Sequence, residues 1–156
     1  MNLMRLLLVV TIPLAVGGLS GFATARGVQD WYPTLVKPFF NPPSWVFGPV
    51  WTVLYLMMGI AAYLVLQKGW ENGTVRVALA VFAIHLVLNG LWSVLFFGMR
   101  SPGLAFVEII LLWISIVGSI ALFWRVVPLA GILLVPYLGW VTFAAVLNGA
   151  IWSLNR

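Results

Sequence analysis

Long uncharged stretches of the chain are separated by single charged residues, and this pattern predicts the secondary structure. A helix rises about 1.5 Å per residue and the hydrocarbon core of a bilayer is about 30 Å thick, so about 20 apolar residues cross it. Uncharged or nearly uncharged stretches of this length or longer occupy residues 6–25, 38–67, 77–99, 101–124 and 126–155. They lack the alternation of apolar and polar residues that is typical of a membrane barrel strand. We therefore predict an all-α membrane protein, a bundle of five transmembrane helices near residues 5–25, 44–67, 76–98, 103–125 and 128–152.

The first connection, residues 26–43, is much longer than the others and is rich in proline. Its prolines, at positions 33, 38, 42 and 43, exclude a long helix and stiffen the segment. Its aromatic side chains have no reason to face water, so we expect them to cover the end of the bundle as a lid. These side chains are Trp31, Tyr32, Phe39 and Phe40. No repeat or linker divides the chain, so we predict one domain over residues 1–156.

Composition excludes a water-soluble globule, because 63% of the residues are hydrophobic and 7% are charged, against about 25% charged in soluble domains. The eight Lys and Arg residues are scattered singly, so no basic stripe is present to bind nucleic acid. Without cysteine, the chain forms no disulfide and no thiolate-ligated metal site. The basic residues divide equally between the two sides of the predicted bundle, so the positive-inside rule assigns no orientation.

The first predicted span has an alternative interpretation as a cleavable signal peptide. Arg5, the leucine-rich stretch after it and Ala23-Thr24-Ala25 fit that interpretation. Against it, the apolar part is longer than the usual signal core of about 7 to 15 residues. Gly17 and Gly21 also lie four residues apart, a spacing typical of a closely packed membrane helix. We therefore favour a resident first helix.

Polar and aromatic residues form stripes on the predicted second and third spans. Trp51 and Tyr55 lie four residues apart on one face, and His85, Asn89 and Trp92 share a face of the next span. An amide in lipid needs a partner, so Asn89 is expected to face the bundle interior. The sequence therefore predicts an aromatic-walled cavity in the half of the bundle beneath the first loop.

The last span adds Tyr137 and Trp140, which follow Pro136, where the helix could kink. The competing interpretation is that such aromatics only pack helices together or anchor them at the membrane interface, as we expect for Trp70, Trp124 and Trp152. Three charged residues lie near the predicted mouth of the cavity and are called the rim charges, namely Arg26, Asp30 and Lys37. They could meet polar groups of a ligand or simply be solvated.

One histidine and one glutamate lie inside the predicted spans. His85 could ligate haem, but a lone histidine in a bundle is more often a hydrogen-bonded packing residue. Glu108 could relay protons, although snorkelling to the interface or pairing with a basic neighbour is the more common behaviour. No cluster of metal-ligating residues is evident, and we predict no metal site.

Several sequence runs carry a family resemblance. The first runs from Trp31-Tyr32 through Lys37-Pro38 and Asn41-Pro42-Pro43 to the segment 45–55, WVFGPVWTVLY. Further runs are Asn89-Gly90-Leu91-Trp92, Phe96-Phe97-Gly98, Val135-Pro136-Tyr137-Leu138-Gly139-Trp140, and Leu147-Asn148 with Trp152. Together they resemble the TspO/MBR family of tryptophan-rich sensory proteins and translocator proteins, the peripheral-type benzodiazepine receptors. The likeness covers nearly the whole chain.

The resemblance implies a five-helix bundle, commonly a homodimer, in a membrane such as the bacterial cell membrane. It implies a pocket under the first loop that takes porphyrins, haem-like tetrapyrroles and isoquinoline carboxamide or benzodiazepine drugs as ligands, with no separate cofactor required. The matching pocket positions are Tyr32, Trp51, Tyr55, Asn89, Trp92, Phe96, Tyr137 and Trp140.

The family suggests three classes of activity. The first is ligand binding with a regulatory or sensory role in tetrapyrrole or stress metabolism, which we favour. The second is light- and oxygen-dependent porphyrin degradation, for which Trp51 and Trp140 would be the catalytic residues. The sequence shows no activated nucleophile or carboxylate pair to support enzyme chemistry. The third is transport of tetrapyrroles or sterols, but the spans lack the broken helices and paired charges typical of transporters.

Two segments depart from the family pattern. Phe39-Phe40 stands where many bacterial relatives have tryptophan, which removes indole N–H donors. Gly149 and Ser153 replace the Tyr and Arg associated with sterol in animal members, so that segment does not support sterol binding. Val28, Tyr32 and Lys37 do fit a loose cholesterol pattern, which is only a hypothesis-grade signal.

Overall fold

The computed structural model describes residues 3–156 and consists of five long helices with short helical turns between them. The long helices are α1 (Leu3–Arg26), α2 (Phe47–Leu66), α3 (Gly73–Ser93), α4 (Pro102–Val126) and α5 (Pro128–Leu154). The short elements are the π-helical turns η1 (Gly27–Trp31) and η4 (Val94–Gly98) and the 3₁₀ turns η2 (Tyr32–Thr34) and η3 (Ser44–Val46). Five helical segments are long and apolar enough to cross a membrane, and this confirms the predicted fold class.

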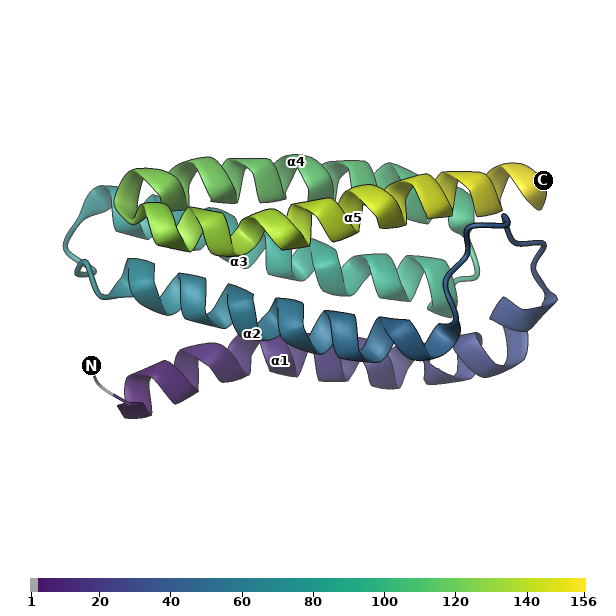
Figure 1. The fold of residues 1–156 in the computed structure, drawn as a ribbon, viewed down its shortest axis with the longest axis horizontal. Helices are drawn as coiled ribbons and strands as arrows, with labels where there is room; N and C mark the ends of the chain where they lie inside the picture. Colours follow the sequence, from purple (N-terminus) through teal and green to yellow (C-terminus); the bar gives the residue numbers. More distant parts are fainter. Residues whose placement is uncertain (1–2) are drawn as a thin grey trace.

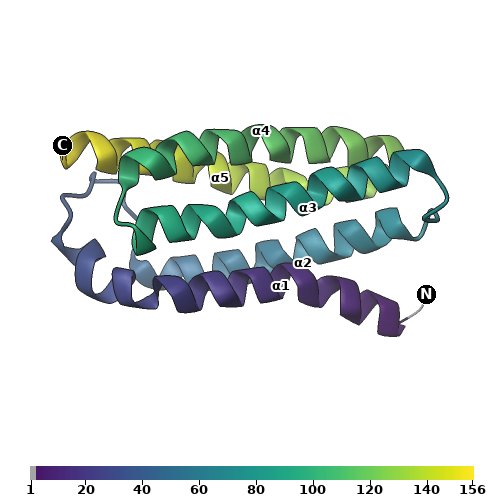
Figure 2. The same ribbon diagram turned by 180° about the vertical axis from the view of Figure 1, so that it is seen from behind.

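The helices form a closed ring whose spatial order differs from their order in the chain. α1 packs against α2 and α3, α5 packs between α2 and α4, and α4 packs against α3 (Figure 1). The view from behind shows α3 between α4 and α1 (Figure 2). The ring order is therefore α1, α2, α5, α4, α3. Apolar side chains such as Leu19, Phe22 and Val87 are exposed on the outside, as expected of a surface in contact with lipid.

Local sequence explains several helix starts. Pro102 and Pro128 occupy the first turns of α4 and α5, where the missing N–H of proline costs nothing. Asn72 caps α3, because its side-chain oxygen accepts a hydrogen bond of 2.9 Å from the Thr74 N–H. Asn72 therefore has a structural role at the start of α3.

Four of the predicted helix ranges agree with the long helices to within three residues, and the fifth, 76–98, covers both α3 and η4. The predicted loop 26–43 is too long. Helical geometry continues past Arg26 through η1 and η2 to Thr34. The ring centroid of Trp31 lies 5.6 Å from that of Phe96, and the ring centroid of Tyr32 lies 5.8 Å from that of Phe97. This packing against η4 holds residues 27–34 in helical form. Within the predicted loop, only residues 35–43 therefore lack helical geometry.

Only some of the aromatic side chains of the loop cover the end of the bundle. Asn41 donates its backbone N–H to the Pro38 carbonyl over 3.0 Å, which closes a turn with Phe39 and Phe40 at its corner. The Phe40 ring faces inward, with its centroid 6.4 Å from that of Phe143 on α5. Phe39 is fully exposed at 101%. The expectation that every loop aromatic folds inward is therefore wrong for Phe39, because one corner of this turn must face outward.

A pair of hydrogen bonds fastens the loop to the end of α5. The Val36 N–H donates to the Asn155 side-chain oxygen, and the Asn155 side-chain NH₂ donates to the Val36 carbonyl, each over 2.9 Å. The same NH₂ group donates to the Ile151 carbonyl over 2.7 Å, which fixes the amide on the helix. We call the Val36–Asn155 pair the loop clasp.

Candidate functional site

A cavity of about 490 Å³ lies inside the half of the bundle next to the first loop. Its wall is built by α1, α2, α3 and α5, with Val28 of η1 and Tyr32 of η2 at the loop end. On α1 the wall consists of Leu14 and five small residues, namely Gly17, Gly18, Ser20, Gly21 and Thr24. The rest of the wall includes eight aromatic side chains, two of which, Phe96 and Phe97, come from η4. The volume lies in the range of sites that enclose small organic ligands.

The structure brings together most of the residues that the sequence predicts for a site. All of the predicted positions except Tyr137 line this one cavity, namely Tyr32, Trp51, Tyr55, Asn89, Trp92, Phe96 and Trp140. Tyr137 lies behind Trp51 with ring centroids 6.2 Å apart, and it is only 1% exposed. Tyr137 therefore supports the wall instead of forming it. The stripes on the second and third spans correctly placed Trp51, Tyr55, Asn89 and Trp92 at the cavity, whereas Tyr137, predicted from the resemblance, lies behind the wall.

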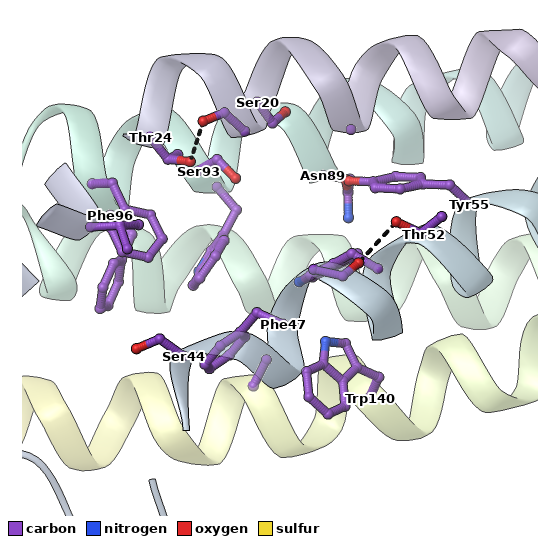
Figure 3. A pocket seen from close by; sticks show the side chains of 18 of the residues that line it. Ser20, Thr24, Ser44, Phe47, Thr52, Tyr55, Asn89, Ser93, Phe96 and Trp140 are labelled. Carbon is purple, nitrogen blue, oxygen red and sulfur yellow. Dashed lines mark hydrogen bonds between the residues drawn. The ribbon is translucent and has the colours of Figure 1, made fainter. Parts of the chain in front are cut away.

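The polar part of the wall is a hydrogen-bonded chain that joins three helices. The Tyr55 hydroxyl of α2 donates to the Asn89 side-chain oxygen of α3 over 2.6 Å. The Asn89 NH₂ group then donates to the Tyr137 hydroxyl of α5 over 3.0 Å. Figure 3 shows the Tyr55 side chain directed at the neighbouring Asn89. We call Tyr55, Asn89 and Tyr137 the polar chain.

Gly17 makes room for this arrangement. A Cβ atom at position 17 would overlap the Tyr55 ring, so a larger residue would displace Tyr55 from Asn89. By contrast, a Cβ at Gly18 or Gly21 would meet nothing within 4 Å. These two glycines leave the α1 side of the cavity open and unobstructed.

Trp140 carries an unused hydrogen-bond donor. Its indole N–H is buried and has no partner among the described residues. The ring projects from α5 into the cavity region (Figure 3), where its centroid is 6.0 Å from that of Phe47. A buried donor without a partner is unusual in a native structure, so the position of this N–H beside the cavity is notable.

Trp92 is held in place by a residue that the sequence-based site set omits. The Trp92 indole N–H donates to the Asn148 side-chain oxygen over 3.0 Å, and the Asn148 NH₂ group donates to the Pro102 carbonyl over 2.8 Å. Asn148 is buried and also lines the cavity. An asparagine within an apolar span needs a partner, and this requirement is the signal that could have identified it.

The rim residues have local roles. Lys37 donates to the carbonyls of Pro33 and Leu35 over 3.4 and 3.1 Å, and its amino group lies 4.8 Å from the centre of the Tyr32 ring. The other two rim charges, Arg26 and Asp30, are exposed. Val28 and Tyr32 of the loose cholesterol pattern both line the cavity, so that pattern does not define a separate outer surface.

His85 and Glu108 lie outside the cavity wall. His85 is 0% exposed and packs edge-on against Phe82 with ring centroids 4.6 Å apart. Its ring interacts with the Phe82 backbone, so His85 is a packing residue inside the bundle. Residues 3–156 contain no group of three metal-ligating side chains.

Glu108 contradicts both common expectations for a charged residue in a span. It is 5% exposed, and neither carboxyl oxygen has a partner among the described residues. It therefore neither snorkels to the interface nor pairs with a base. The physical reason is its position on the face of α4 that includes Ala105, Ile109 and Leu112, all buried in the bundle.

Comparison with known proteins agrees with the architecture. The model of the TspO/MBR family matches residues 9–153. The chain is 48% identical to the tryptophan-rich protein TspO of Chlorobaculum tepidum, over 99% of this chain and 98% of that protein. It is 44% identical to the tryptophan-rich protein TspO of Archaeoglobus fulgidus, over 99% of each chain. It is 39% identical to the translocator protein of Homo sapiens, over 88% of this chain and 81% of that protein.

Proposed function

The chain belongs to the TspO/MBR family of membrane proteins, and from this premise we propose that it binds porphyrins and related tetrapyrroles in the cavity beneath the first loop. Isoquinoline and benzodiazepine drugs would occupy the same cavity. In this proposal the protein has a regulatory or sensory role, in which occupancy of the cavity is the signal.

The observation that carries the proposal is the set of aromatic side chains that line a cavity of about 490 Å³. Trp51 stacks on Tyr55 with ring centroids 5.5 Å apart, and Trp92 stacks on Phe96 at 5.2 Å. A flat conjugated ligand gains apolar burial and ring contacts from such walls, each ring contact contributing about 0.5–1.5 kcal/mol beyond burial. Shape and ring faces would therefore supply most of the affinity.

Polar groups would fix the orientation of the ligand. The free Trp140 N–H offers one donor, and Tyr55 and Asn89 offer hydroxyl and amide groups on a neighbouring part of the wall. A tetrapyrrole with propionate or carbonyl oxygens carries the acceptors that these donors require. The loop clasp would then keep the aromatic cover over the bound ring.

A fluorescence-quenching titration with protoporphyrin IX tests the proposal. We expect Trp51→Ala and Trp140→Ala each to weaken binding by about 10- to 100-fold, since each removes a stacking surface worth about 1.5–3 kcal/mol of buried ring. Trp70→Ala is the matched control, because Trp70 lies in the connection between α2 and α3 and is 56% exposed. If all three variants bind the porphyrin as the unmodified protein does, the cavity is not the binding site.

A second candidate function is photo-oxidative porphyrin degradation, and one observation favours it. Trp51 and Trp140 both line the cavity, so two oxidisable indoles would lie against the same bound macrocycle. Illumination of the porphyrin complex in oxygen distinguishes the candidates. Degradation predicts a loss of porphyrin absorbance with a bilin-like product, and this loss would slow in Trp140→Phe. Binding alone predicts the same slow bleaching in both proteins.

A further inference from the structure

The cavity wall is exposed along one edge, where α1 faces the start of α2. Most of the residues that line the cavity are buried or half-buried. The exposed ones all lie on α1 or on the segment formed by η3 and α2, namely Gly18, Gly21, Ser44, Gly48 and Thr52. The cavity therefore opens between α1 and α2, and we call this edge the side opening.

The residues that border the side opening leave it clear. A Cβ atom at Gly18, Gly21 or Gly48 would meet nothing within 4 Å. Thr52 donates its hydroxyl to the Gly48 carbonyl of its own helix over 2.9 Å, so this hydroxyl proton is already used. The two helices therefore border the side opening with small groups and with no bulky side chain.

Farther from the loop, α1 and α2 are in close contact. A Cβ atom at Gly59 would lie 2.6 Å from the Val10 Cα, and a Cβ atom at Gly17 would overlap the Tyr55 ring. Both contacts lie deeper in the bundle than the residues that border the side opening. The side opening therefore begins where this close contact of the two helices ends.

The other approaches to the cavity are covered by contacts. Toward α3, a Cβ atom at Gly90 would lie 3.5 Å from the Ser20 Oγ, an ordinary van der Waals contact. At the loop end, the Tyr32 hydroxyl donates to the Asn41 side-chain oxygen over 2.6 Å, and the loop clasp holds the loop to α5. A ligand that entered at the loop would have to break these hydrogen bonds, whereas passage through the side opening leaves them intact.

The side opening faces the lipid and not the water. Gly18 lies eight residues before the end of α1 and Thr52 lies five residues after the start of α2, about 12 and 8 Å along the helix axes. The outer side chains beside it are apolar and exposed, namely Leu19, Phe22 and Val53. In a membrane-spanning bundle such side chains contact acyl chains, so the side opening connects the cavity with the hydrocarbon of the bilayer.

We propose that the side opening is the entrance of the cavity, and that it admits flat apolar ligands that are dissolved in the lipid. The identity of the ligand rests on the proposed function, whereas the opening itself does not. The ring of such a ligand would stack on Trp51, and an alkyl or ester substituent would remain between the helices in contact with lipid. A ligand with charges on every edge would be rejected, because an ionised group is costly to transfer into hydrocarbon.

A photoreactive lipid tests the side opening without any pigment. A phosphatidylcholine with a diazirine on one acyl chain is held in the bilayer by its headgroup, so its chain reaches the cavity only from the side. We expect adducts on Tyr55 and Asn89, which line the cavity and are 7% and 4% exposed, as well as on Phe22 outside. Peptide mass spectrometry locates them. Adducts confined to outer residues such as Phe22 would overturn the proposal.

Two glycine variants form a matched pair for this labelling. Gly18→Leu places a side chain in the side opening and should lower the adducts on Tyr55 relative to those on Phe22 several-fold. Gly139→Leu is the control, because Gly139 is exposed on α5, a Cβ atom there meets nothing within 4 Å, and it does not line the cavity. Equal labelling of Tyr55 in the two variants would show that the acyl chain does not pass Gly18 and would refute the entrance.

Displacement kinetics test whether a ligand uses the same route. Protoporphyrin IX is bound to the protein in vesicles and displaced by an excess of an isoquinoline carboxamide, and tryptophan fluorescence follows its release. Gly18→Leu should slow release by about 2- to 10-fold, because the leucine must leave its preferred rotamer for the ligand to pass. The equilibrium dissociation constant should stay the same, since a barrier slows entry and release alike. Gly139→Leu should release the porphyrin as the unmodified protein does.

The loop variant distinguishes the two routes. Asn155→Ala removes the loop clasp and should leave the release rate unchanged if the ligand leaves through the side opening. Faster release in Asn155→Ala, together with equal rates in Gly18→Leu and Gly139→Leu, would assign the route to the loop and overturn the proposal. If protoporphyrin IX does not bind to the unmodified protein, the proposed function fails, and the photoreactive lipid still decides whether the cavity opens to the bilayer.

Discussion

The loop clasp provides the sharpest test of how the cavity is closed. Asn155→Ala removes both hydrogen bonds to Val36. A hydrogen bond of this kind contributes about 0.5–1.5 kcal/mol net, and less when exposed, so the pair is worth about 1–2 kcal/mol. The population of the open loop should therefore rise by about 5- to 30-fold. We expect amide hydrogen exchange at Val36 and its neighbours to accelerate by the same factor, measured by mass spectrometry on the loop peptide.

Two further variants separate the clasp from general loosening of the helix end. Asn155→Asp keeps an acceptor for the Val36 N–H but loses the donor to the Val36 and Ile151 carbonyls, so its effect should exceed that of a simple deletion through repulsion between oxygens. Ser153→Ala, at an exposed position on the same turn, should exchange as the unmodified protein does. Unchanged loop exchange in Asn155→Ala would show that the aromatic contacts alone hold the loop and would refute the reasoning.

Two further predictions concern the packing beside the cavity and the start of α3. Gly17→Ala places a Cβ atom into the Tyr55 ring and should lower the free energy of unfolding by about 1–3 kcal/mol. Gly18→Ala is the control, because a Cβ atom at position 18 meets nothing within 4 Å, and it should leave the free energy of unfolding unchanged. Equal thermal midpoints in the two variants would contradict the close approach of Gly17 to Tyr55. Asn72→Ala removes the cap of α3 and should destabilise the protein by about 1 kcal/mol. Asn72→Asp keeps the acceptor oxygen and should retain the stability of the cap. A thermal midpoint that is unchanged in Asn72→Ala would show that the cap contributes nothing.

The fold could be predicted from the sequence because an uncharged stretch long enough to cross the bilayer indicates a membrane-spanning helix. Helix starts at Pro102 and Pro128 follow from local chemistry as well. The extension of the first helical segment to Thr34 was not accessible in this way. It depends on packing of Trp31 and Tyr32 against a segment more than 60 positions later in the chain, and no local pattern encodes that contact.

The candidate site was predictable in outline for a similar reason. Spacing along a helix fixes the face on which Trp51 or Asn89 lies, but it does not fix which ring stands in front of another. Tyr137 therefore proved to lie behind Trp51. The burial of Glu108 and the contact between Val36 and Asn155 depend on how whole helices meet, which no single segment determines.

The ring order of the helices has a consequence for the order in which the protein is made. α5 is the final helix in the chain, yet it lies between α2 and α4. A nascent chain that has delivered α1 to α4 into the bilayer still lacks the Trp140 wall, the Asn148 bridge and the Asn155 end of the clasp. Until α5 has been translated and inserted, the cavity lacks one of its walls and the loop clasp cannot form.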